Sequence, residues 1–342
     1  MLIRFLLAIL VLAAVLLAGS LILPSKVHVE RSIEVSRAPS VVFLLLNDFE
    51  HFQQWSPWAE KDPNATYQFG DKTSGVGARL SWSGDPRAVG TGWQEITQSQ
   101  PNSLVRTHLS FEDHGEADAY FEIRPVGRGS RVEWGFDTDM TEGKNFFVGA
   151  AGKYMGLLVD YWVGQDFSSG LSQFKQYAES FPEMDIADLE IEIVEAQPQN
   201  ILFVSSSSGK SNDAIAAALG AAYGEISRFM NSRGIKSSGM PMSITRSWNE
   251  QGYAFDAAIP VDNETVNTTG SVQFGQSPSG KAVRAIHRGP YSKLRDTYDT
   301  LDTYFAVHRF RRGDVSWEHY ISDPGNTEES NLITHIYVKL AE

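Results

Sequence analysis

The chain has 342 residues, of which 42% are hydrophobic and 21% are charged, so it has room for two folded domains and a further segment. The net charge of -13 is shared evenly, because residues 26–180 and residues 181–342 each contain 14 Lys and Arg against 21 Asp and Glu. Neither half offers the basic surface that nucleic-acid binding needs, and we expect no nucleic acid among the partners. The absence of cysteine excludes disulfides, thiolate catalysis and cysteine metal sites, and it leaves the compartment open.

The N-terminus contains an uncharged apolar run at residues 5–23, which Pro24 ends. About 20 apolar residues span a bilayer as a helix, so residues 1–25 predict a single-span membrane anchor. A cleaved signal peptide is the alternative, since Ala18-Gly19-Ser20 would suit a cleavage site, although the apolar run continues through Leu23. Arg4 favours soluble domains outside the cytoplasm, but Lys26 and Arg31 weaken the charge asymmetry and leave the cytoplasmic face open.

The first soluble half begins with alternating apolar and polar residues at 27–35, which predict a strand directly after the anchor. Arg37-Ala38-Pro39-Ser40 predicts a turn into a helix at 41–46, and a second short helix is expected near 49–54. Short alternating segments from Tyr67 to Asp139, separated by Gly, Asn and Asp, predict an antiparallel meander.

A long amphipathic helix is predicted within residues 145–181, where the apolar spacing changes to helical intervals. Gly149, Gly152 and Gly156 indicate that its N-terminal part is loose or that the helix begins late. Strand, short helices, curved sheet and long helix together describe an α+β domain in which a sheet grips a helix over a cavity.

Four of the eight tryptophans lie within the 39 positions from Trp55 to Trp93, interleaved with glycines. Flat apolar rings beside residues without side chains favour a concave apolar surface, and core packing of each ring is the alternative. The candidate pocket residues of this half are Trp55, Trp58, Trp82, Trp93, Tyr120 and Trp134.

The order of motifs in residues 26–182 resembles the SRPBCC superfamily, in the branch labelled polyketide cyclase/dehydrase-like. The resemblance rests on Trp55-Ser56-Pro57-Trp58, Gly75-Val76-Gly77-Ala78, Trp82-Ser83-Gly84 and Gly90-Thr91-Gly92. It implies a helix-grip (START-like) fold with a deep apolar pocket. It does not imply an enzyme, because the superfamily includes lipid carriers, hormone receptors and a minority of cyclases.

The second half follows a short acidic linker at 183–188 and contains a duplicated unit of strand, helix, strand and strand. The first copy is expected as a strand at 189–195, a helix from 212 to about 233 and strands near 240–245 and 253–261. The second copy is expected as a strand at 281–287, a helix at 291–307 and strands at 315–322 and 332–340. Such a duplication packs about a pseudo-twofold axis.

Ser205 to Ser208, followed by Gly209-Lys210-Ser211, predict a capped turn before the first helix.

Residues 187–342 resemble the GyrI-like, or effector-binding, small-molecule domain of some bacterial transcription regulators. The matching segments are Gly234-Ile235, Gly239-Met240-Pro241, Phe255-Asp256-Ala257-Ala258-Ile259-Pro260-Val261, His287-Arg288-Gly289-Pro290-Tyr291, Trp317-Glu318-His319-Tyr320, Asp323-Pro324 and Thr334-His335-Ile336-Tyr337-Val338. Ser243-Ile244-Thr245 and His335 depart from the family pattern, which leaves the class of ligand open.

Glu318 is the leading site residue of the second half. Alternation along its strand places Trp317 and His319 on one face and Glu318 with Tyr320 on the other, and a solvated second face is the alternative. The resemblance implies that the Glu of this Glu-x-Tyr strand meets a cationic or polar ligand group, with Tyr320, Tyr291 and Trp317 as neighbours. A carboxylate ringed by aromatics suits an organic cation, and a partly buried one could also act as a general base.

The eight histidines are scattered without the spacing of a metal site, and no phosphate-binding or nucleophile-elbow motif is present, so we expect no metal and no cofactor. The sequence therefore predicts a membrane-anchored protein that binds apolar or cationic small molecules for sensing, sequestration or delivery. The alternatives are a hydrolase that uses Glu318 as general base, a cyclase-like activity in the first cavity, and a structural partner of a membrane complex.

Overall fold

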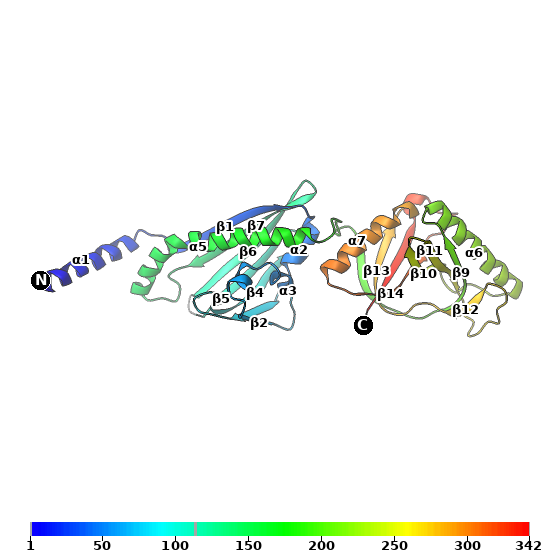
Figure 1. The fold of residues 1–342 in the computed structure, drawn as a ribbon, viewed down its shortest axis with the longest axis horizontal. Helices are drawn as coiled ribbons and strands as arrows, with labels where there is room; N and C mark the ends of the chain where they lie inside the picture. Colours follow the sequence, from blue (N-terminus) through cyan, green and yellow to red (C-terminus); the bar gives the residue numbers. More distant parts are fainter. Residues whose placement is uncertain (1, 113–114, 342) are drawn as a thin grey trace. The chain divides into compact units, whose positions relative to one another are not determined.

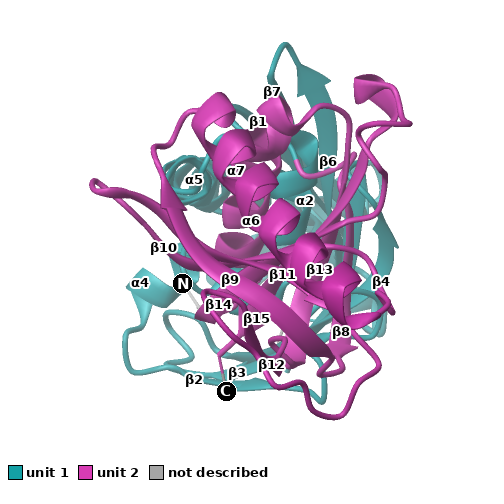
Figure 2. Cartoon of the chain, turned by 90° about the vertical axis from the view of Figure 1, so that its right-hand side faces the viewer, with its two compact units in different colours: residues 1–185 teal, residues 186–342 magenta. Residues whose placement is uncertain are grey.

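The computed structural model of the protein describes residues 2–112 and 115–341 and has an α+β fold. The chain divides into two compact units, residues 1–185 and residues 186–342, which Figure 2 draws in different colours. Each unit contains one antiparallel sheet and at least one long helix, so each is described by itself (Figure 1).

Unit 1 begins with helix α1 (Leu2–Ser20), in which Arg4, in the first turn, is followed by an uninterrupted run of uncharged residues. Its window Ile3–Ser20 has a mean hydropathy of 2.5 and is 6% buried. The helix is therefore long and apolar enough to span a membrane, a property that signal sequences share.

The sheet of unit 1 has the strand order β1-β7-β6-β5-β4-β3-β2, in which every neighbouring pair is antiparallel. The meander predicted from Tyr67 to Asp139 is confirmed, and the first strand joins it through β7, with Val29 opposite Phe136. The strands are β1 (Lys26–Val35), β2 (Thr66–Phe69), β3 (Arg79–Ser83), β4 (Thr91–Gln100), β5 (Leu104–Phe111), β6 (Gly115–Val126) and β7 (Gly129–Asp139).

A 34-residue helix, α5 (Phe146–Glu179), lies against this sheet, as Figure 1 shows. Phe167, Leu171 and Phe174 are its large buried apolar residues, and the ring of Trp134 on β7 stacks on Phe167 with centroids 4.0 Å apart. Three short helices complete the unit: α2 (Pro39–Leu46), α3 (Phe49–Phe52) and α4 (Pro57–Lys61).

The expectation that α5 is loose or begins late is wrong. The helix starts at Phe146, directly after Asn145, whose side-chain oxygen accepts a hydrogen bond from the Val148 amide as an N-cap. A Cβ atom on Gly152 would collide with the carbonyl oxygen of Met140, and one on Gly156 would lie 3.0 Å from Val27. The glycines therefore allow the helix to approach the polypeptide beside it closely, without interrupting the helix.

The sheet of unit 2 has the strand order β12-β9-β11-β10-β14-β15-β13-β8. Within this order, the first copy contributes β9-β11-β10 and the second copy contributes β14-β15-β13. The second set repeats the first in the opposite direction, which gives the predicted pseudo-twofold arrangement. The strands are β8 (Glu190–Ala196), β9 (Asn200–Ser208), β10 (Met242–Asn249), β11 (Gly252–Pro260), β12 (Gln273–Gln276), β13 (Gly280–Arg288), β14 (Arg312–Tyr320) and β15 (Ile333–Leu340).

The first copy of the duplicated unit starts with a different strand from the one expected. The strand at 189–195 is β8, which pairs with β13 at the edge of the second copy, whereas β9 pairs with β11 and opens the first copy. The capped turn predicted over residues 205–211 is confirmed only in its last part: Ser205–Ser208 belong to β9, whereas Ser211 is the N-cap of α6. Ser205 is an exposed residue of β9 and donates a hydrogen bond to the buried carboxylate of Asp256.

Helices α6 (Asn212–Arg233) and α7 (Leu294–Val307) cover the same face of the sheet, α6 over Phe255 and Ala257 and α7 over Ala285 and Ile336. Figure 1 shows α7 beside β13 at one end of the sheet and α6 beside β9 at the other. Short 3-10 turns lie at Tyr291–Lys293 and Glu329–Asn331. Ser211 accepts a hydrogen bond from the Ala214 amide at the start of α6, and Gly234 ends it at φ 63°.

Candidate functional site

The carboxylate of Glu318 lies on the helix-covered face of β14 and is only 9% exposed. Its register partners, Ser243 on β10 and Ile336 on β15, lie on the same face. Tyr298 of α7 donates a hydrogen bond of 2.8 Å to Oε1, and Tyr320 donates one of 2.7 Å to Oε2. The solvated face that was the alternative for Glu318 is therefore excluded.

Phenol groups from several elements surround this carboxylate. Tyr223 of α6 donates a hydrogen bond of 2.7 Å to the carbonyl of Met242, and the hydroxyl of Tyr253 lies 2.9 Å from that of Ser243. The negative charge of Glu318 influences the titration of five tyrosines: Tyr223, Tyr253, Tyr291, Tyr298 and Tyr320.

Burial raises the pKa of Glu318, because an apolar surrounding disfavours the charged form. The hydrogen bonds from Tyr320 and Tyr298 and the charge of His287 act in the opposite direction and offset part of this shift. Burial, followed by the charge of Glu318, holds the pKa of Tyr298 well above its usual value and raises the pKa of Tyr253 to about 12. The phenols therefore keep their protons and serve as donors.

His287 and Thr334 extend the site along the same sheet face. Nδ1 of His287 lies 2.8 Å from the hydroxyl of Thr297, and Nε2 lies 3.2 Å from the carbonyl of Pro290, so both ring nitrogens are engaged. Thr334 stands in register between Tyr320 and His287, and its buried hydroxyl has no hydrogen-bond partner among the described residues. A ligand that reaches this face would meet that hydroxyl.

The sequence-based neighbours of Glu318 separate into two groups in the structure. Tyr320 binds the carboxylate, and the ring of Tyr291 packs edge-on against Tyr320 with centroids 5.6 Å apart. Trp317 projects to the opposite face of β14, where it is 1% exposed and stacks on Tyr337 at 5.0 Å. The sequence reasoning missed Tyr298, although Tyr291 and Tyr298, seven residues apart, would share one face of the helix expected at 291–307.

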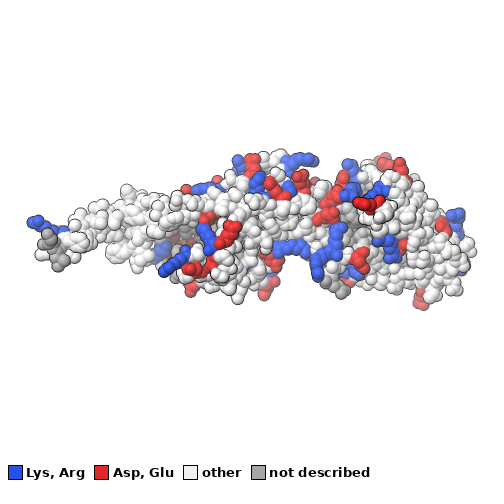
Figure 3. Space-filling model, viewed as in Figure 1, with Lys and Arg blue, Asp and Glu red and all other residues white. Residues whose placement is uncertain are grey.

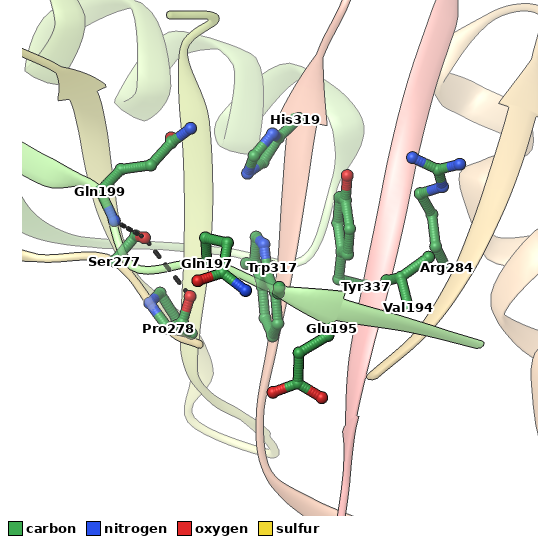
Figure 4. A pocket seen from close by; sticks show the side chains of 11 residues that line it. Val194, Glu195, Gln197, Gln199, Ser277, Pro278, Arg284, Trp317, His319 and Tyr337 are labelled. Carbon is green, nitrogen blue, oxygen red and sulfur yellow. Dashed lines mark hydrogen bonds between the residues drawn. The ribbon is translucent and has the colours of Figure 1, made fainter. Parts of the chain in front are cut away.

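Trp317 borders a separate cavity of about 230 Å³ on the face of the sheet opposite Glu318 (Figure 4). Arg284, His319 and Tyr337 stand along it, and the segment with Gln197 and Gln199 crosses it. Burial, and then the charge of His335, lowers the pKa of His319 to about 4. His319 is therefore a neutral ring at physiological pH.

Unit 1 contains a cavity of about 200 Å³. Trp58 and Trp82 line it, and both rings are fixed by hydrogen bonds, from Trp58 Nε1 to Asp166 at 3.2 Å and from Trp82 Nε1 to the carbonyl of Val89 at 3.1 Å. The remaining lining residues are Phe52, Ser56, Tyr67, Leu80, Ala88, Val89, Gln94, Leu109 and Phe111.

The other four aromatic candidates of unit 1 lie elsewhere. Trp55 and Trp134 are 1% and 2% exposed and pack in the core between sheet and α5. Arg79 covers the ring of Trp93 at 3.9 Å, and Tyr120 donates a hydrogen bond of 3.1 Å to Glu30. Within residues 2–112 and 115–341, no group of three or more His, Asp or Glu side chains is placed to hold a metal ion.

Comparison with protein families explains the two-unit arrangement. Residues 26–179 match the family described as polyketide cyclase / dehydrase and lipid transport, and residues 189–341 match the GyrI-like small molecule binding domain. The two matches lie in tandem, one in each compact unit. Both resemblances predicted from the sequence are thus confirmed, and the GyrI-like domain contains Glu318 and its tyrosines.

Solved structures are similar to parts of the chain at low identity. The EcmrR–DNA complex is 15% identical, with 58% of this chain and 73% of that chain covered and a TM-score of 0.42. An uncharacterized conserved protein from Listeria innocua is 13% identical, with 44% and 92% covered and a TM-score of 0.36. A hydrolase from the same organism is 14% identical, with 44% and 92% covered and a TM-score of 0.34. No curated protein matches the chain.

Proposed function

We propose that the protein is a membrane-anchored binding protein for small hydrophobic or amphipathic molecules, and that its GyrI-like domain binds organic cations through Glu318. The observation that carries the proposal is the buried carboxylate, whose hydrogen-bond partners are the neutral phenols of Tyr298 and Tyr320. A carboxylate taken out of water without a cationic partner is costly, and a bound organic cation would supply the missing charge.

The aromatic surroundings of Glu318 favour the same class of ligand. Tyrosine rings attract cations through their electron-rich faces, and three of them, Tyr291, Tyr298 and Tyr320, stand around the carboxylate or its bonded phenol. Because Glu318 is 9% exposed, a ligand reaches it only when at least one of these side chains moves. The unpartnered hydroxyl of Thr334 offers a further polar contact on that face.

The helix-grip domain would bind an apolar ligand in the cavity lined by Trp58 and Trp82. Helix α1 would anchor this domain to a membrane, with the soluble units on the outer side as the charge of Arg4 favours. Such an arrangement suits sensing, sequestration or delivery of compounds that partition into lipid.

A hydrolase that uses Glu318 as general base is the second candidate, and the raised pKa of this carboxyl favours it. The mechanism requires a water molecule on a carboxylate whose two oxygens already accept phenol hydrogen bonds, so at least one phenol would have to swing away. A cyclase-like activity in the first cavity is a third candidate, and Gln94, which is 6% exposed, is a polar group on its wall.

Replacing Glu318 with Gln tests the proposal, because the amide keeps the size of the side chain and removes its charge. We expect binding of tetraphenylphosphonium, a permanent cation, to weaken at least 30-fold, which corresponds to about 2 kcal/mol or more for an unpaired buried charge. Neutral triphenylphosphine oxide should change little. Isothermal titration of the full chain in detergent measures both affinities.

Glu195→Gln is the matched control, since Glu195 is an exposed carboxylate beside the cavity on the opposite face of the sheet. It should leave both affinities unchanged. Equal affinity of the Glu318 variant and the parent for the cation would contradict the proposal. Loss of turnover on a small ester, with binding nearly retained, would instead support the hydrolase.

A further inference from the structure

The exposed side of α5 carries apolar residues up to Trp162 and polar residues after it. Five residues at intervals of four, four, three and four follow this side through the first half of the helix, and three polar residues continue it through the second half. The first set is Phe147, Ala151, Met155, Leu158 and Trp162, and the second set is Gln165, Ser169 and Ser172.

The first half exposes large apolar side chains that a helix facing water does not present. Phe147 is 69% exposed, Leu158 is 45% exposed and Tyr161 is 64% exposed. Phe146, Val148 and Leu157 beside them are each at least 50% exposed. The remainder of α5 buries its apolar residues against the sheet and turns Ser and Gln outward, so the apolar surface belongs to residues 146–162 alone.

This surface adjoins helix α1. The hydroxyl of Tyr154 donates a hydrogen bond of 2.8 Å to the carbonyl of Leu16, and the amine of Lys153 donates one of 3.1 Å to the carbonyl of Ser20. The end of the membrane-spanning candidate is therefore fixed to the first turns of α5. On the face drawn in Figure 3, the part of unit 1 that carries these two segments is largely white, apart from blue atoms at the tip of α1.

We propose that residues 146–162 of α5 lie in the lipid bilayer beside α1, with Tyr161 and Trp162 at the boundary between lipid and water. This inference rests on the proposed membrane anchoring. The segment contains two charged residues, and both are engaged within unit 1: Lys153 binds Ser20, and Asp160 forms an ion pair with Arg31 at 3.0 Å. Asp160 is the more exposed of that pair, which limits the depth of insertion to the turns before it.

Dimensions and residue types agree with a lipid environment. Seventeen helical residues extend about 25 Å, which gives the exposed side of the segment a long contact with lipid while its other side packs on Val27 and Met140. Tyr and Trp are the side chains that accumulate at membrane boundaries, because each combines an apolar ring with a polar group. The second half of α5, with Ser169 and Ser172 outward, would stand in water. The helix-grip domain would then be seated in the membrane surface by two helices, and not merely tethered to it by one.

Site-directed spin labelling of the full chain in phosphatidylcholine–phosphatidylglycerol vesicles tests the proposal, and the native chain has no cysteine to interfere. The variants are Leu158→Cys in the apolar half, Ser169→Cys on the same side three turns later and Leu10→Cys in α1. Oxygen concentrates in lipid, whereas a nickel chelate stays in water. We expect the collision rate with oxygen to exceed that with the chelate at least fivefold for labels at positions 10 and 158. The label at position 169 should show the reverse preference.

The three labels separate failure of this proposal from failure of the anchor. Lipid exposure at position 10 with water exposure at position 158 overturns the inference and leaves the anchor standing. Lipid exposure at position 158 with water exposure at position 10 upholds the membrane-bound α5 and overturns the anchor. Water exposure at both overturns the two proposals together. Strong dipolar coupling between labels at position 158, with access to neither reagent, assigns the surface to a second copy of the chain and overturns the inference.

Discussion

Glu318 illustrates a conflict between stability and binding at a single residue. Its carboxyl group is held among phenols and apolar side chains, and burial raises its pKa. The folded chain therefore holds a proton on Glu318 more tightly than the unfolded chain does. Ionisation of this group therefore opposes folding, and a bound cation would offset that cost.

Glu318→Gln should therefore make the unliganded chain more stable at neutral pH. The unfolded glutamate titrates near pH 4.3 and the folded one at higher pH, so stability attributable to this group falls as pH rises between the two values. Below that window both side chains are neutral, and the variant should match the parent. Thermal unfolding from pH 4 to pH 8 measures the divergence.

The other titrating groups are common to both proteins, so the difference between their curves reports on position 318. A variant that is less stable than the parent at pH 8 would mean that the ionised carboxylate, with its two phenol donors, is the favoured native form. That result would remove the energetic basis for cation binding, although the geometry of the site would be unchanged.

At the scale of the element, local patterns in the sequence predicted most helices and strands and failed where long-range pairing decides. Period-two alternation placed Trp317 and Glu318 on opposite faces of β14, as the structure has them. It could not indicate that α6 and α7 cover the Glu318 face, nor that Tyr298 would reach the carboxylate. Strand β8 was expected in the first copy of the duplicated unit, but it pairs with β13 of the second copy. Pairing between strands so far apart in the chain leaves no local pattern in the sequence.

Helix α6 ends at Arg233, as the sequence predicted, and the glycine directly after it supplies a test of local energetics. Gly234 has φ 63°, a left-handed conformation that other residues adopt at a cost, so Gly234→Ala should destabilise the chain by about 1 kcal/mol. Urea-induced unfolding measures the change in free energy.

Gly220→Ala is the matched control within the same helix. A Cβ atom at Gly220 meets no atom within 4 Å, and its backbone is helical, so this change should stabilise α6 by up to about 1 kcal/mol. Equal effects of the two substitutions would mean that the end of α6 frays in solution and that its left-handed cap contributes nothing.

At the scale of the whole molecule, composition and motif order predicted two ligand-binding units and an apolar N-terminal helix, and the families matched at 26–179 and 189–341 agree. The sequence indicated an aromatic cavity in the first unit, but it could not separate Trp58 and Trp82, which line it, from Trp55 and Trp134 in the core. That distinction depends on how α5 lies in the sheet, because α5 fills part of the space that the tryptophans border.

The anchor is tested by extraction. The full chain should remain in the membrane pellet after a carbonate wash, and its intact mass should include α1. Leu10→Arg places a charge at the middle of the helix at a cost of about 3 kcal/mol for insertion, so most of the variant should leave the membrane. A mature protein whose mass begins near Ser20 would identify α1 as a signal sequence and contradict the anchor.

The five residues between the end of α1 at Ser20 and the start of β1 at Lys26 have a consequence for how a ligand is encountered. A linker of this length reaches at most about 17 Å, so an anchored helix-grip domain would stay within that distance of the lipid headgroups. Its ligand would arrive from a two-dimensional reservoir in which an apolar compound is far more concentrated than in water. Apparent affinity would then follow the mole fraction of the compound in lipid, and adding empty vesicles would weaken binding by dilution.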